Sequence, residues 1–371
     1  MATTLQPQRR RLDPAVFNLP VEKMRAGYYS DTYFNRVREI LERDHRHPRV
    51  LMQVFNKKDA VLCGIDEAIA ILRLCAGRTI AGGRWESAWD ALDVRALYDG
   101  DRIGPYETVL TIEGDYASFA HLETDYLGVL ARRTKVATNT SAVVAAANGK
   151  NVLFFPARFD HHLVQTGDGY AAYVSGALGV STDAQAEWWG SRGTGTVPHG
   201  LIAAYGGDTV LAVRKFAEHI DPSVNVIALV DFDNDCVATS LAVARALGRR
   251  LWGVRIDTAE TLVDESLWHE MGTFNPTGVN PALVLNVRRA LDAAGFAWVK
   301  IIVSGGFDAE KIRAFESRAI PVDAYAVGSA LFQGRFDFTA DIALAEKDGA
   351  MVECHKVGRP YNPNPRLDKV D

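Results

Sequence analysis

The sequence has few of the residues that form disulfide frameworks and zinc sites. Its four cysteines are scattered along 371 residues and form no CxxC pair: Cys63, Cys75, Cys236 and Cys354. This pattern gives neither a disulfide scaffold nor a zinc site, and it is typical of proteins in a reducing cytoplasm. We therefore expect a cytoplasmic protein without zinc or another structural metal site.

Long apolar runs and an excess of basic residues are also missing. No run approaches the ~20 apolar residues that a membrane span requires. Residues 1–11 end in three arginines, lack the apolar core of a signal peptide and are expected to be frayed. The net charge of −5 gives no reason to expect nucleic acid or a membrane as a partner.

The length of 371 residues predicts two domains, because single hydrophobic cores stop growing near ~250–300 residues. Residues 12–135 mix helices and strands without alternation, which indicates an N-terminal α+β domain. We expect helices at 28–41, 64–74 and 121–130, and strands at 50–55 and 108–113. The polar tail 335–371 is expected to pack back on this domain or to fray.

Residues 136–334 alternate regularly between short apolar strands and helices. The expected strands are 151–155, 224–230, 251–256, 300–303 and 324–327. Helices are expected at 138–148, 167–178, 208–219, 236–247, 281–294 and 309–317. Repeated βα units of this kind predict an α/β domain with a parallel sheet, open or closed into a barrel.

Two glycine turns at strand ends are the clearest functional signal. Ser304-Gly305-Gly306 follows the strand 300–303, and Gly328-Ser329 follows the strand 324–327. Turns of this kind expose backbone N–H groups that can surround a phosphate, helped by the positive end of a following helix. One such turn would be read as a tight turn only, but two of them, one helix apart, favour a phosphate site.

Charged residues follow the other strands of this half. Arg158 follows the strand 151–155, Asp231 follows 224–230, and Arg255 and Asp257 lie at the end of 251–256. Because the carboxyl ends of parallel strands share one rim, these residues predict a ligand with phosphate groups, hydroxyls and a second anion. Each arginine could instead be an ordinary salt-bridge partner of one of these aspartates.

Other residue types weigh against competing chemistries. A lysine Schiff base needs a lysine at the carboxyl end of a strand, whereas Lys300 begins its strand, which argues against an aldolase. Asp235 could merely cap the helix 236–247. His199 could be a histidine at a helix start with no function.

At this point a series of motifs resembles a known family. Between Tyr29 and Leu331 the chain is similar to nicotinate phosphoribosyltransferases, which are type II phosphoribosyltransferases. The matching segments occur in order: Asp31-Thr-Tyr33, Glu123-Thr-Asp-Tyr-Leu-Gly, Phe155-Pro-Ala-Arg158, Gly193-Thr-Gly-Thr-Val-Pro-His199, Leu229-Val-Asp231, Val254-Arg255-Ile-Asp257-Thr258, Ser304-Gly-Gly306 and Val327-Gly328-Ser329.

The resemblance implies an N-terminal sandwich-like domain and an irregular α/β barrel. It also implies a head-to-tail homodimer with shared active sites and the reaction of nicotinate with phosphoribosyl pyrophosphate (PRPP). The products would be nicotinate mononucleotide and pyrophosphate. Breaking the anomeric C–O bond builds charge on the pyrophosphate, so we expect fixed cations and Mg²⁺ there and little need for a general base. ATP is expected as a facultative co-substrate.

The resemblance also implies roles for single residues. Phe155 and the Tyr33 of a neighbouring subunit would sandwich the pyridine ring, and Arg158 and Arg255 would bind phosphates and the pyridine carboxylate. Asp257 would hold ribose hydroxyls, and His199 would be transiently phosphorylated when ATP is hydrolysed. Asp231 and the two glycine turns (Ser304, Gly305, Gly306, Gly328 and Ser329) complete the substrate site. Lys135, beside Arg132 and Arg133, is a candidate pyrophosphate contact or part of a solvated basic face.

The identity of the base stays open at this stage. Asp183 lies near the position that reads the pyridine substituent. Its carboxylate would repel the carboxylate of a nicotinate substrate, and an aspartate here resembles the nicotinamide-using relatives. Quinolinate would need further basic residues around its second carboxylate. Pro156 stands where the family usually has glycine. A catalytically silent homologue that binds a nucleotide as a sensor is an alternative of a different class.

Overall fold

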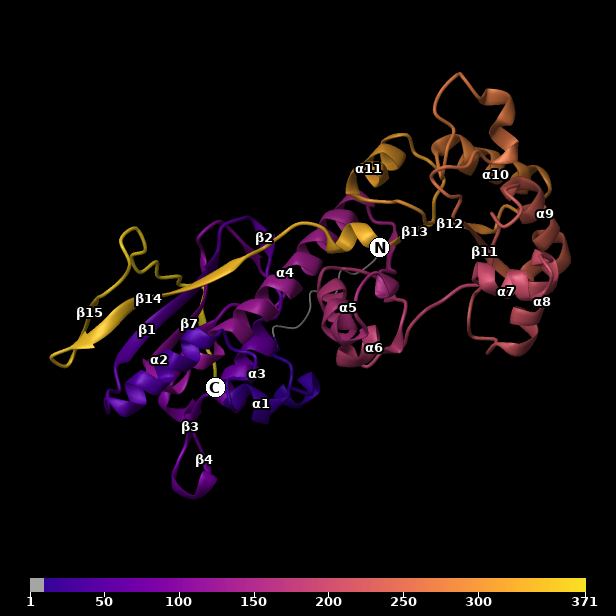
Figure 1. Cartoon of the computed structure of the whole chain (residues 1–371). Helices are drawn as coiled ribbons and strands as arrows, with labels where there is room; N and C mark the ends of the chain where they lie inside the picture. The colour runs from indigo at the N-terminus through magenta and orange to yellow at the C-terminus, as the bar shows by residue number, and fades with distance from the viewer. Residues whose placement is uncertain (1–9) are drawn as a thin grey trace. The chain divides into compact units, whose positions relative to one another are not determined.

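The computed structural model describes residues 10–371. The chain forms two compact units, one made of the described residues up to Thr138 together with Gly334–Asp371, the other of Asn139–Gln333 (Figure 1). Most of the head that we expect to be frayed lies outside the described residues. Its last residue is not frayed, because an Nη1 N–H of Arg11 donates to Asp66 Oδ1 over 2.9 Å.

A six-stranded antiparallel sheet forms the centre of the first unit. Its strand order is β15-β14-β1-β7-β5-β16, and in Figure 1 β14 runs beside β1. The polar tail therefore contributes three of the six strands, although its sequence predicted no strand. The bounds are β1 Arg49–Asn56, β5 Asp93–Ala96, β7 Thr108–Asp115, β14 Phe338–Lys347, β15 Ala350–Glu353 and β16 Asp368–Lys369.

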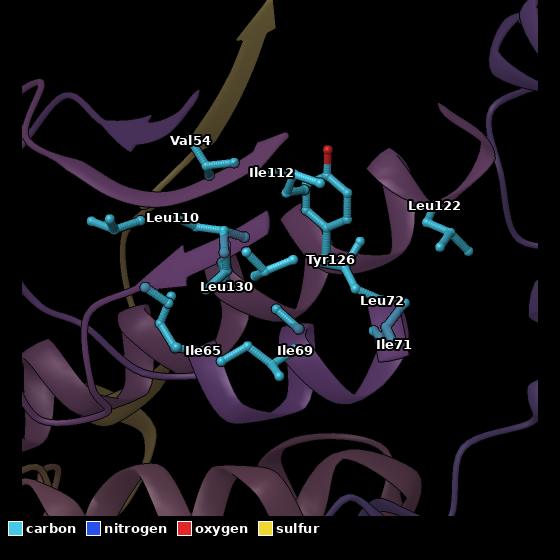
Figure 2. Close-up of a cluster of buried hydrophobic side chains, with 14 of the residues drawn as sticks. Val54, Ile65, Ile69, Ile71, Leu72, Leu110, Ile112, Leu122, Tyr126 and Leu130 are labelled. Carbon is cyan, nitrogen blue, oxygen red and sulfur yellow. The ribbon is translucent and has the colours of Figure 1, made fainter. Parts of the chain in front are cut away.

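Helices pack on this sheet through an apolar cluster. Figure 2 shows Val54 of β1 and Leu110 of β7 near Ile69 of helix α3 (Ile65–Cys75) and Leu130 of helix α4 (Glu123–Ala146). Full burial of each such side chain contributes about 1.5–3 kcal/mol. The cluster fixes α3 and α4 on the sheet. The unit also holds helices α1 (Val21–Arg25) and α2 (Thr32–Arg43). It has two small two-stranded antiparallel sheets, β2 (Ala60–Val61) with β6 (Arg102–Ile103) and β3 (Gly77–Thr79) with β4 (Trp85–Ser87).

Several helix predictions are wrong at their boundaries. The expected helices 121–130 and 138–148 are one continuous helix, α4 (Glu123–Ala146), because the intervening residues 131–137 contain neither proline nor glycine. Helix α2 begins at Thr32 and not at residue 28. Gly27, with φ of 69°, lies in a left-handed turn that precedes it.

The second unit is built on a six-stranded parallel sheet with the order β10-β11-β12-β13-β8-β9. The predicted strands 251–256, 300–303 and 324–327 are confirmed to the residue. The strands are β8 Asn151–Phe154, β9 Gly179–Val180, β10 Val226–Leu229, β11 Leu251–Ile256, β12 Lys300–Val303 and β13 Ala324–Val327. The helices are α5 Gln165–Val174, α6 Asp183–Ala186, α7 His199–Ala204, α8 Thr209–His219, α9 Cys236–Leu247, α10 Pro281–Ala293 and α11 Ala309–Ser317.

An irregular segment joins the two edge strands of this sheet. The Thr194 N–H donates to Val180 O of β9 over 2.7 Å, and the Val197 N–H donates to Ile227 O of β10 over 3.5 Å. The segment therefore bridges both edges, although it is not a strand itself. The predicted fold class, an irregular α/β barrel preceded by an α+β domain, is confirmed.

Candidate active site

One cavity of the second unit collects most of the residues singled out from the sequence. It has a volume of about 710 Å³ and lies at the carboxyl ends of the barrel strands. That size suits a small-molecule ligand. Its lining includes Phe155, Arg158, His199, Arg255, Asp257, Ser304, Gly305, Gly306, Gly328 and Ser329.

Both glycine turns need glycine where they meet this cavity. Gly305 and Gly306 have φ of 81° and 66°, in the left-handed region that other residues rarely adopt. A Cβ on Gly306 would lie 1.9 Å from Glu260 Oε1, and a Cβ on Gly328 would lie 2.7 Å from a ring carbon of Phe159. The turns therefore place bare backbone against the cavity, as a phosphate site requires.

The first turn is tied to the end of the neighbouring strand. The Ser304 hydroxyl donates to Asp257 Oδ1 over 2.6 Å, and the Ser304 N–H donates to Ile256 O over 3.0 Å. Because one oxygen of Asp257 is held by this bond, its carboxylate has a fixed orientation beside the turn. A carboxylate so held can accept hydrogen bonds from hydroxyl groups of a ligand.

His199 and Asp231 form a pair beside the cavity. His199 begins α7, directly after the segment that bridges β9 and β10, and its Nε2 lies 3.0 Å from Asp231 Oδ2. Burial raises the pKa of Asp231, while His199 opposes the shift. The second oxygen, Asp231 Oδ1, is buried without a hydrogen-bond partner in the described part of the chain.

The two arginines of the cavity have no ion-pair partner among residues 10–371. Burial lowers the pKa of Arg255, Asp257 and Asp231 oppose this shift, and Arg158 adds to it. Arg255 Nε is buried without a hydrogen-bond partner in the same residues. The interpretation of these arginines as ordinary salt-bridge partners is therefore wrong. A buried guanidinium with an unused donor is suited to bind an anionic ligand.

Besides Asp231, which lies beside this cavity, three candidate site residues from the sequence do not line it. Asp183 begins α6 and its Oδ1 accepts a hydrogen bond from the Gly193 N–H over 2.8 Å. Tyr33 is exposed on α2, and Lys135 is half-buried on α4; both belong to the first unit. Asp235 caps α9 by accepting from the Ala238 N–H over 2.9 Å, so its capping role is confirmed.

In the first unit, the two N-terminal motifs meet one another. The Asp31 N–H donates to Thr124 Oγ1 over 3.0 Å, and the Thr124 hydroxyl donates to Asp31 Oδ2 over 3.1 Å. The Tyr33 hydroxyl is 3.5 Å from the same Asp31 oxygen. Burial, together with Asp341 and Asp31, raises the pKa of Glu123 to about 8. The segments around Asp31 and Thr124 are therefore joined by hydrogen bonds beside the exposed Tyr33.

Sequence reasoning missed three residues of this region. Glu260 and Phe159 line the cavity and press on the two glycine turns. Lys311, on α11, donates from Nζ to Gly305 O over 3.2 Å. Glu260 lies three residues after Asp257, and Phe159 directly follows Arg158. Both could therefore have been suspected from the sequence, because each is close to a residue of a family motif. Lys311 carried no such signal.

Metal clusters and membrane-spanning helices are both absent from the described residues. Between residues 10 and 371, no three His, Cys, Asp or Glu side chains are grouped so that they could hold a metal ion. In the same residues, no helix has the length and apolarity needed to cross a bilayer.

Comparisons with known proteins agree with the geometry. Residues 31–134 match the family model described as the quinolinate phosphoribosyl transferase N-terminal domain. The chain is 30% identical over 270 residues to nicotinate phosphoribosyltransferase pncB1 of Mycobacterium tuberculosis, an alignment covering 70% of this chain and 55% of that protein. It is 22% identical over 269 residues to nicotinate phosphoribosyltransferase of Bacillus subtilis, covering 71% and 51%. The chain spans about half the length of these curated relatives.

Solved structures extend the likeness over almost the whole chain. Human nicotinic acid phosphoribosyltransferase shares the fold, with 15% identity and a TM-score of 0.63 over 89% of this chain and 76% of that one. Nicotinate-nucleotide pyrophosphorylase from Pyrococcus furiosus is 33% identical, with a TM-score of 0.77 over 95% of this chain and 85% of that chain. At this identity and coverage, the chain belongs to the type II phosphoribosyltransferases.

Proposed function

We propose that the protein transfers the phosphoribosyl group of PRPP to nicotinate, giving nicotinate mononucleotide and pyrophosphate. One observation carries this proposal: Arg158 and Arg255, both without ion-pair partners in the described residues, share a cavity with two glycine turns. PRPP offers a 5′-phosphate for the turns, and its pyrophosphate and the carboxylate of nicotinate offer anions for the arginines. The nicotinate phosphoribosyltransferases among its relatives support the same reaction.

The chemistry needs positioning and charge more than proton transfer. As the anomeric C–O bond breaks, negative charge grows on the departing pyrophosphate and positive charge on the ribose. Arg158 and Arg255 would stabilise the negative charge on the pyrophosphate, in a site where burial strengthens electrostatic interactions. The carboxylate of Asp257, oriented by Ser304, would hold the ribose hydroxyls. The pyridine nitrogen attacks with its own lone pair, so no general base is required.

We propose Mg²⁺ as the metal that accompanies PRPP. Mg²⁺ is usually bound by one or two carboxylates together with substrate phosphates and waters. The donor set fits this pattern, because Asp231 has one buried oxygen without a hydrogen-bond partner in the described chain and Asp257 lines the cavity. These two carboxylates would hold the ion, which would neutralise charge on the pyrophosphate.

The base would bind against an aromatic side chain of the cavity. Phe155 lines this cavity and would stack on one face of the pyridine ring. Tyr33, exposed on its own unit, would cover the other face from a second copy of the chain. We therefore propose a homodimer with shared active sites, acting in the cytoplasm without nucleic acid or membrane partners. Lys135 is proposed as a pyrophosphate contact.

Nicotinate is preferred over the two other bases for reasons of charge. Nicotinamide has no carboxylate, so it would leave a buried arginine unpaired. The argument for nicotinamide relied on Asp183, whose carboxylate accepts from the Gly193 N–H and is not among the cavity-lining residues. Quinolinate is the second candidate, supported by the family model at residues 31–134. Its two carboxylates and the pyrophosphate would have to share the two arginines and His199.

We further propose that ATP is a facultative co-substrate, hydrolysed through transient phosphorylation of His199. The bond between His199 Nε2 and Asp231 leaves Nδ1 as the ring nitrogen available to a phosphoryl group. The carboxylate of Asp231 would orient the ring and stabilise positive charge on it.

Pyrophosphate release tests the reaction class. The purified protein is given PRPP and Mg²⁺ with each of nicotinate, nicotinamide and quinolinate, and with no base as the control. We expect release that depends on both PRPP and nicotinate. Binding of PRPP without release for any base would refute the enzyme proposal and favour a nucleotide-binding sensor.

A further inference from the structure

Lys311 contacts the first glycine turn from outside the cavity. It lies in the first turn of α11, it is half-buried, and it is not among the residues that line the cavity. Its Nζ donates to Gly305 O over 3.2 Å and lies 4.4 Å from the centroid of the Phe307 ring. Within residues 10–371, Lys311 has no ion-pair partner. In this structure, Lys311 reaches the cavity through its contact with the turn.

Peptide geometry connects this contact to the cavity. The C=O of Gly305 and the N–H of Gly306 belong to one planar, trans peptide unit, so they point in opposite directions. A lysine that holds the carbonyl on one side fixes the N–H on the other side. In the described chain the Gly306 N–H has no hydrogen-bond partner, and Gly306 lines the cavity. The orientation of this N–H therefore depends on the bond to Lys311.

Ser304 ties the start of the turn to β11, but among residues 10–371 no hydrogen bond other than that of Lys311 holds the Gly305–Gly306 peptide itself. Gly305 and Gly306 are consecutive glycines with positive φ, and glycine has more backbone freedom than any other residue. Fixing one residue costs about 1–2 kcal/mol of backbone entropy, and a ligand would have to supply that free energy if the turn were not already ordered. A turn ordered in advance binds a phosphate more tightly.

The cost of placing a lysine here argues against a purely structural role. Burial lowers the pKa of Lys311, while Glu260 and Asp308 oppose this shift. Partial burial of an ammonium group without an ion pair is unfavourable, and an apolar side chain would fill the space beside Phe307 without that cost. In exchange, the ammonium group has its hydrogen bond to Gly305 O and its cation–π contact with the Phe307 ring. Only the hydrogen bond acts on the turn that meets the cavity.

We propose that Lys311 is a positioning residue for the phosphate of the donor substrate. It holds the Gly305–Gly306 peptide so that the Gly306 N–H faces the cavity and meets the 5′-phosphate. This inference rests on the proposed function, because it identifies what shapes the phosphate end of that site. Lys311 does not touch the reacting atoms, so its loss weakens donor binding and leaves the chemical step largely unchanged.

Steady-state kinetics of matched variants test this role. Lys311→Met removes the contact and the charge but keeps the length of the side chain. Arg313→Met removes one positive charge from the exposed face of the same helix and is the control. A hydrogen bond to a charged group is worth about 1.5–3 kcal/mol, so we expect the KM for PRPP to rise roughly 10- to 100-fold in Lys311→Met. The kcat, the KM for nicotinate and all constants of Arg313→Met should stay near those of the unmodified protein.

A binding measurement separates this inference from the proposed function. Calorimetric titration with ribose 5-phosphate needs no turnover, and we expect Lys311→Met to weaken this affinity while Arg313→Met does not. Lys311→Arg keeps a donor near Gly305 and should bind more tightly than Lys311→Met. Equal ribose 5-phosphate affinity of Lys311→Met and the unmodified protein would overturn the inference, even if turnover is normal. If the unmodified protein binds ribose 5-phosphate but turns over no base, the proposed reaction fails and the Lys311 comparison still stands.

Discussion

Substitution of Arg255 by methionine separates function from stability at the centre of the cavity. Arg255 lies on β11, between β10 and β12 in the sheet, and its Nε has no hydrogen-bond partner among the described residues. Burial lowers its pKa, against the opposing effect of Asp257 and Asp231. The folded protein therefore holds this charge less favourably than the unfolded chain does.

The expected effects on activity and stability have opposite signs. If Arg255 makes two charge-assisted hydrogen bonds to an anionic group of the substrates, each is worth about 1.5–3 kcal/mol. Their loss equals a roughly 10²- to 10⁴-fold fall in kcat/KM. The free energy of unfolding should stay unchanged or rise, because an unfavourably buried cation is removed. A structural ion pair would instead predict a loss of about 3–5 kcal/mol.

Two assays on the same preparation measure these effects. Pyrophosphate release with PRPP and nicotinate gives kcat/KM, and denaturant unfolding gives the free energy of unfolding. Arg245→Met, which removes an exposed arginine of α9, controls for the change in net charge. An Arg255→Met protein that is fully active, or that is strongly destabilised, would refute this reasoning.

Two further predictions concern His199 and Glu123. In the unmodified protein ATP should lower the apparent KM for the substrates, whereas His199→Asn should keep the ATP-independent reaction and lose this effect; an absence of ATP hydrolysis by the unmodified protein would leave His199 structural. Burial raises the pKa of Glu123 from 4.5 to about 8, so the folded state favours the protonated carboxyl. The protonated carboxyl therefore contributes to stability fully below pH 4.5, and this contribution is lost as the pH rises through about 8. Relative to Glu123→Gln, the free energy of unfolding should therefore fall by up to about 1.4 kcal/mol per pH unit across this range, and parallel pH profiles of the two proteins would contradict the shift.

The sequence predicts the barrel unit well because its signals are local. Strands β11, β12 and β13 are short, mostly apolar runs followed by Asp257, Ser304 and Gly328. Helices α9 and α11 begin after an aspartate cap. The same ends carry the functional residues, so the cavity could be predicted as a rim. The sequence could not predict that Arg158 and Arg255 lack ion-pair partners within residues 10–371, because this depends on how the folded chain buries and arranges its charged side chains.

Long-range pairing explains what the sequence did not reveal. Strand β14 pairs with β1 from nearly 300 residues away, with Val54 opposite Ala340. Its own sequence, FTADIALAEK, is rich in alanine, which does not favour a strand. The bridging role of Thr194 and Val197 depends on two edge strands, and the role of Lys311 depends on a carbonyl six residues earlier. Asp183 was chosen by its position in a motif, and the structure gives its carboxylate a backbone partner in Gly193.

Product formation from each base tests the central claim most directly. The purified protein, with PRPP and Mg²⁺, is given nicotinate, nicotinamide or quinolinate in separate reactions, and the mononucleotide formed is measured by mass spectrometry over time. We predict that nicotinate mononucleotide forms from nicotinate with a higher kcat/KM than any product from the other two bases. Faster turnover of nicotinamide or quinolinate would contradict the assignment of Arg158 and Arg255 to a single pyridine carboxylate and the pyrophosphate.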